Sequence, residues 1–151
     1  MATVVPKFLK LPPSHAPGMN VAKFLKAGLY TIKSVRVNYN DASPAALFDV
    51  PANTFVVEVK VRIVTAFGGT TPLITIGDGD DADGFFTSAE IAPATAIAGY
   101  KSSLKGAQPY AGGKIYTAAD TIDAVITITD TVAGIFDAWV VYRSFSDIDE
   151  L

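Results

Sequence analysis

Residues 54–86 read TFVVEVKVRIVTAFGGTTPLITIGDGDDADGFF, and this stretch indicates the fold class. From Phe55 to Val64 the side chains alternate between two faces. One face holds Phe55, Val57, Val59, Val61 and Ile63, and the other holds Val56, Glu58, Lys60, Arg62 and Val64. A period of two over such a run, rich in β-branched residues, predicts a β-strand. We expect the apolar face to be buried and the charged face to meet water or a polar partner.

The strand is interrupted by Gly68 and Gly69, and a second strand is expected over 73–76. Paired glycines supply the positive φ that a tight reversal needs, so the two strands are expected to form a hairpin. An acidic loop over 77–84, GDGDDADG, closes its far end.

The rest of the chain offers further short strands and no long helix. We expect strands over 29–38, 47–51, 114–117, 121–129 and 134–145, separated by Gly, Pro, Asn and Asp turn signals. Both faces of 134–145 are apolar at its centre, which places this strand in the middle of a sheet or under a subunit interface formed by Trp139, Val141 and Arg143. The pattern predicts an all-β fold, an antiparallel β-sandwich or jelly roll.

The first 28 residues are predicted to form an extended arm outside a β-sandwich domain over 29–145, with an acidic tail over 146–151. Their prolines disfavour regular structure, although 20–28 fits a short helix. Every charge before Asp41 is positive, so the arm suits an acidic surface. The arm residues expected to hold a partner are Val4, Val5, Lys7, Phe8, Leu9, Lys10, Leu11, Lys23 and Lys26.

The amino-acid composition limits the kinds of function that this chain is expected to have. Half of the 151 residues are hydrophobic and only 18% are charged, which fits either a large core or a buried subunit interface. There is no cysteine, and no apolar run reaches the ~20 residues of a membrane span. The basic residues are spaced singly, so direct nucleic-acid binding is not expected.

Few residues suggest a catalytic or metal-binding site. His15, the only histidine, lies in the proline-rich arm, where a rigid catalytic site is not expected, so no enzyme is predicted. Asp78, Asp80, Asp81 and Asp83 crowd into one loop, and a hard cation such as Ca²⁺ would relieve their repulsion. The spacing departs from an EF-hand, because Ala82 and Asp83 stand at the fifth and sixth positions. A loose calcium site and a solvated turn held by Asx hydrogen bonds both remain open. No other cofactor is expected.

Several motifs resemble small structural proteins of tailed bacteriophages. They are ANTFVVEVKV at 52–61, TAFGGT at 65–70, ITIGD at 74–78 and DADGFFT at 81–87, followed by the late strands. The resemblance leaves out the basic arm. It implies a non-enzymatic virion protein on the capsid surface, of the head decoration or cement type, which binds the major capsid protein and associates with itself as a trimer or dimer.

Two alternatives remain at this stage. One is a tail or fibre component of the same kind of particle. The other is a Ca²⁺-dependent carbohydrate-binding β-sandwich module, in which the acidic loop would carry the metal.

Overall fold

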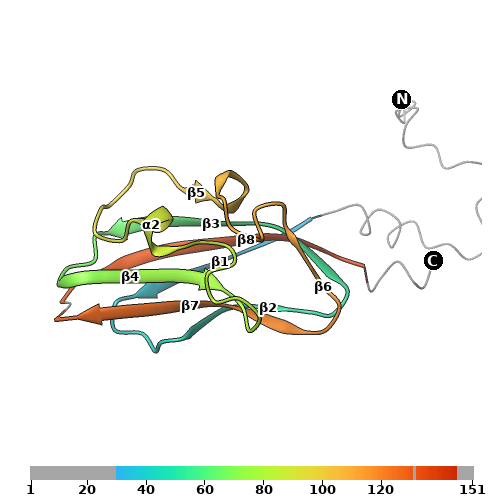
Figure 1. Ribbon diagram of the computed structural model, residues 1–151, viewed down its shortest axis with the longest axis horizontal. Coiled ribbons are helices and arrows are strands. Elements are labelled where there is room, and N and C mark those ends of the chain that lie inside the picture. The colour runs from blue at the N-terminus through green and yellow to red at the C-terminus, as the bar shows by residue number, and fades with distance from the viewer. Residues whose placement is uncertain (1–29, 131, 146–151) are drawn as a thin grey trace, which may run out of the picture.

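Two antiparallel sheets pack against each other in the computed structural model, which describes residues 30–130 and 132–145 (Figure 1). Sheet A contains β1 (Thr31–Asn38), β8 (Ile135–Ser144) and β3 (Thr54–Thr65) in that order, with β5 (Lys101–Ser102) and β6 (Lys114–Tyr116) both paired to β3. Sheet B contains β2 (Ala45–Val50), β7 (Asp120–Thr129) and β4 (Thr70–Gly77). The predicted all-β sandwich is confirmed.

The strand with two apolar faces, β8, lies in the middle of sheet A between β1 and β3. Phe136, Ala138 and Val140 point into the core and are fully buried. Tyr142 of β8 pairs with Thr31 at the start of β1. β1 therefore begins at the end of the sandwich where β8 finishes (Figure 1).

The alternation predicted for β3 is wrong in its first part. The pairing with β8 shifts register between Val56 and Glu58, so Val57 is an extra residue that forms a β-bulge. Because a one-residue insertion exchanges the two faces, Val56 is buried before the bulge, while Val59 is buried after it. Phe55 is only half-buried, contrary to expectation. The charged set Glu58, Lys60 and Arg62 does lie on the outer face, as predicted.

The predicted hairpin between β3 and β4 is also wrong. The turn exists, with positive φ at Gly69 and Thr71, but it carries the chain from sheet A to sheet B. β4 pairs with β7, which follows it by some 50 residues in sequence. In this arrangement Ile74 and Ile76 of β4 are buried in the core between the two sheets.

The segment between β4 and β6 closes one side of the core. It contains the short helix α2 (Ser88–Ile91) and the 3₁₀ turn η2 (Ser103–Lys105). Thr87 and Glu90 form a reciprocal capping box at the start of α2. Phe85 and Ile91 are fully buried against the sheets. No helix in the described part of the chain is long and apolar enough to cross a membrane.

Candidate interaction surface

The residues predicted for a subunit interface lie together on the outer face of sheet A. Trp139, Val141 and Arg143 alternate along β8 with buried residues and are each half-buried. Ile32 of β1 pairs with Val141 and remains 67% exposed. The face is thus apolar in part and partly exposed among residues 30–130 and 132–145, and its contact with a second subunit stays a prediction.

A shared carboxylate ties three strands of this face together. The carboxylate of Asp137 accepts two hydrogen bonds from Arg36, at 2.7 and 2.9 Å, and one from Arg62 at 2.9 Å. The hydrogen bond from Arg36 is the main reason that the pKa of Asp137 lies below its usual value; burial opposes the shift and the bond from Arg62 adds to it. Sequence reasoning missed Asp137, although an acid in the strand with the two apolar faces was a signal.

Aromatic rings lie beside these cations. The guanidinium of Arg62 stands 5.6 Å from the ring centroid of Trp139, and the ammonium of Lys60 stands 4.7 Å from that of Tyr100. The two rings are 6.1 Å apart. The outer face therefore combines Trp, Tyr and Arg, the residue types that are enriched at protein interfaces.

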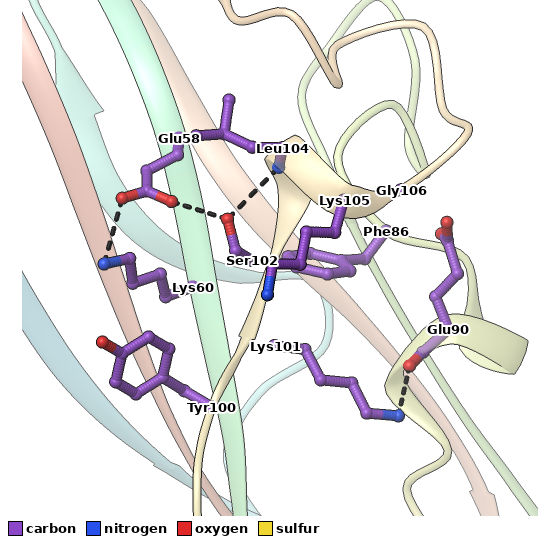
Figure 2. A pocket seen from close by; sticks show the side chains of 10 residues that line it. All are labelled: Glu58, Lys60, Phe86, Glu90, Tyr100, Lys101, Ser102, Leu104, Lys105 and Gly106. Carbon is purple, nitrogen blue, oxygen red and sulfur yellow. Dashed lines mark hydrogen bonds and ion pairs between the residues drawn. The ribbon is translucent and has the colours of Figure 1, made fainter.

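A groove of about 580 Å³ runs between β3, β5, η2 and α2 (Figure 2). Two of its charged groups pair with each other: Glu58 pairs with Lys60 at 3.0 Å and also accepts a hydrogen bond from Ser102. Lys101 donates to the carbonyl oxygens of Glu90 and Ile91. These contacts hold β5 and α2 against β3, which is a structural role.

The acidic loop is organised around one buried carboxylate, that of Asp78. Its Oδ1 accepts hydrogen bonds from the backbone amides of Asp80 and Asp81 and from the Tyr110 hydroxyl. Its Oδ2 accepts bonds of 2.6 Å from both Lys114 and the Tyr116 hydroxyl. Burial alone would raise the pKa of Asp78, but these hydrogen bonds outweigh it and leave the pKa lowered.

The other aspartates of the loop have different surroundings. Asp80 is exposed and also meets Lys114, at 2.9 Å. Asp81 and Asp83 lie close together, and the hydrogen bond between their carboxyl groups raises the pKa of Asp83. Within residues 30–130 and 132–145 no group of three or more acidic or histidine side chains is arranged to hold a metal ion.

Calcium binding by this loop stays a prediction with a direct test. If the loop holds Ca²⁺, calcium raises the melting temperature, chelator reverses the rise, and the combined change Asp80→Asn and Asp83→Asn removes it. Differential scanning fluorimetry with Ca²⁺ and with chelator measures this. A melting temperature that Ca²⁺ leaves unmoved rules out the calcium-dependent carbohydrate-binding alternative.

The arm, the helix predicted over 20–28 and the tail over 146–151 lie outside the described residues. The partner-binding role of the arm, from Val4 to Lys26, therefore stays a prediction.

Three solved capsid structures contain a chain with this fold. The match in the acid-stable capsid of Helicobacter pylori bacteriophage KHP30 has a TM-score of 0.58 and 14% identity, covering 78% of this chain and 89% of that chain. In the capsid asymmetric unit of cyanophage Pam1 the match has a TM-score of 0.59 and 12% identity, covering 95% of this chain and 99% of that chain. In the capsid of Ralstonia phage GP4 the values are 0.54 and 14%, covering 78% and 86%.

No protein-family model matches the sequence, and no curated protein matches it either. At 12–14% identity the structural matches show a shared fold. Since each match covers most of both chains, the matched chains are similar in length to this one. This sandwich is therefore a fold that occurs in chains of phage capsids.

Proposed function

We propose that this protein is a structural component of a tailed-phage virion that decorates the capsid surface and stabilises the shell. The observation that carries the proposal is the fold, which is shared over 78–95% of this chain with proteins of three phage capsids. The sequence motifs at 52–87 point to the same class of particle.

In the proposed mechanism, many copies of the protein bind equivalent sites on the capsid shell. A sandwich stiffened by its core and by the Asp137 and Asp78 networks presents a fixed surface to the shell. A lattice offers the same site many times, so modest apolar and charge contacts add up over all copies. The basic arm supplies charge complementarity to an acidic shell surface.

Locating the protein in intact particles tests the proposal. Cryo-electron microscopy of virions, with quantitative mass spectrometry of copy number, should place many copies in a regular array on the head. Copies restricted to the tail or fibres would contradict the decoration role, and absence from particles would contradict a virion role altogether.

Deleting residues 1–20 tests the role of the arm. We expect the truncated chain to lose binding to purified shells that lack this protein, because the apolar anchors and Lys7 and Lys10 are gone. Far-ultraviolet circular dichroism should still report the folded sandwich, since every described strand is retained. Co-sedimentation with shells measures the binding, and unchanged occupancy would show that the arm is not the attachment site.

A further inference from the structure

The two sheets carry opposite charge. In the described strands every lysine and arginine belongs to sheet A: Lys33, Arg36, Lys60, Arg62, Lys101, Lys114 and Arg143. The strands of sheet B carry only aspartates as charged residues: Asp49, Asp120 and Asp123. The acidic loop follows β4, so it extends the negative side of the molecule.

The outer face of sheet A keeps an excess of positive charge. Arg36 and Arg62 share the single carboxylate of Asp137, which leaves one of the two cations uncompensated. The side chain of Arg36 is 57% exposed and that of Arg62 is 36% exposed, so both guanidinium groups are accessible on this face. Arg143 lies on the same face, and no ion pair to it is formed among these residues. The face thus offers guanidinium donors to an incoming carboxylate.

The outer face of sheet B is acidic and otherwise uncharged. Asp123 alternates along β7 with the buried Ile122 and Ala124, so it points away from the core. Asp49 on β2 pairs with Thr121 and is exposed. Leu73 on β4 adds an apolar side chain that is 45% exposed. This surface suits a basic, partly apolar partner.

We propose that two copies of this chain associate head to tail, with the acidic outer face of sheet B of one copy packed on the basic outer face of sheet A of the next. The two faces complement each other in charge, and the sheet A face already has the Trp, Tyr and Arg composition of an interface. An isologous contact of sheet A with sheet A would instead bring two positively charged faces together.

Such a contact leaves one free face at each end of a pair, so it continues into a closed ring or a filament. It involves no shell component. The association is therefore measured on the full-length protein alone, and its failure leaves shell decoration untouched.

Charge reversal on one face at a time tests the contact. One variant combines Arg36→Glu and Arg143→Glu, and it keeps Arg62 so that Asp137 retains a partner. The other combines Asp49→Lys and Asp123→Lys. We expect each variant to weaken self-association about a hundredfold or more, because like charges then face each other. Sedimentation velocity at about 0.05 M and about 1 M salt measures it, and wild-type association should weaken at the higher salt.

The variant with all four substitutions is the decisive control. Its reversed faces complement each other again, so it should associate with itself as wild type does and fail to co-assemble with wild type in native mass spectrometry. Lys33→Glu makes the same kind of charge change on β1 but on the opposite side, where Lys33 lies over the Tyr142 ring, and should leave association unchanged. Thermal melts confirm that each variant is folded.

Several results would overturn the proposal. They are a wild-type monomer at low salt and high concentration, dissociation by the sheet A variant with no effect of the sheet B variant, and failure of the four-substitution variant to recover association.

Discussion

Replacing Asp78 with alanine is expected to lower the free energy of unfolding by about 3–5 kcal/mol, the usual cost of breaking a buried ion pair by removing one partner. The carboxylate is inaccessible to solvent and joins the start of the acidic loop to Lys114 and Tyr116. Its loss leaves the buried Tyr116 hydroxyl without its acceptor, which carries a desolvation penalty. It also removes the buried partner of the Lys114 ammonium, which keeps the exposed carboxylate of Asp80 and the Tyr110 hydroxyl. Urea denaturation followed by Trp139 fluorescence measures the change.

Asp80→Ala is the matched control. Asp80 pairs with the same lysine, but its side chain is 80% exposed, so its loss should cost about 1 kcal/mol or less. Equal effects of the two substitutions would show that burial of Asp78 does not decide the strength of the contact.

The same carboxylate makes stability depend on pH. The pKa of Asp78 is lowered in the folded protein, so its contribution to stability is present above the unfolded pKa of about 3.9 and is lost as the pH falls through the folded value. Wild type should therefore lose stability on acidification below about pH 4, and Asp78→Asn should lose less over the same range. Parallel acid-denaturation curves for the two proteins would contradict this assignment.

Replacing Gly77 with alanine is expected to destabilise the protein by about 3 kcal/mol or more, at the upper end of the cost of overpacking. A Cβ at this position would lie 1.9 Å from the carbonyl oxygen of Asp81 and 2.4 Å from the carbonyl carbon of Ala82. Both are backbone atoms, so relief requires the whole loop to move. That movement would also break the hydrogen bonds that Asp78 accepts from Asp80 and Asp81.

Gly79→Ala, two residues further along the same loop, is the control for Gly77→Ala. Its Cβ would meet only the carboxylate oxygens of Asp120, at 3.7 and 3.8 Å, which is ordinary contact. Thermal unfolding of both variants should separate them clearly. Similar melting temperatures would show that the loop backbone moves at little cost to accommodate a Cβ at position 77.

The strands were predictable from sequence because burial against an opposite sheet imposes an alternation of apolar and polar residues along each strand. This alternation correctly predicted the positions of β7 and the central β8. It could not detect the bulge at Val57, because Val56 and Val57 are both β-branched and apolar, and either suits the buried face. The β3–β4 turn was recognised, but turn residues do not reveal which strand becomes the neighbour.

The candidate surface was predictable only in part, for a related reason. Trp139, Val141 and Arg143 were found from alternation within one strand. The networks that shape the molecule join residues far apart in sequence: Asp78 meets Tyr116 across 38 positions and Asp137 meets Arg36 across 101. A single sequence marks Asp78 as one acid among four, and only the fold shows which one is buried.

β1 begins and β8 finishes at one pole of the sandwich, while the β3–β4 connection occupies the other. A passenger peptide or enzyme attached directly before β1 or directly after β8, in place of the arm or the tail, would consequently be tethered at the same pole. Peptides inserted between Gly68 and Thr70 would be carried at the opposite pole, so one engineered chain offers two separated attachment points for display on a particle.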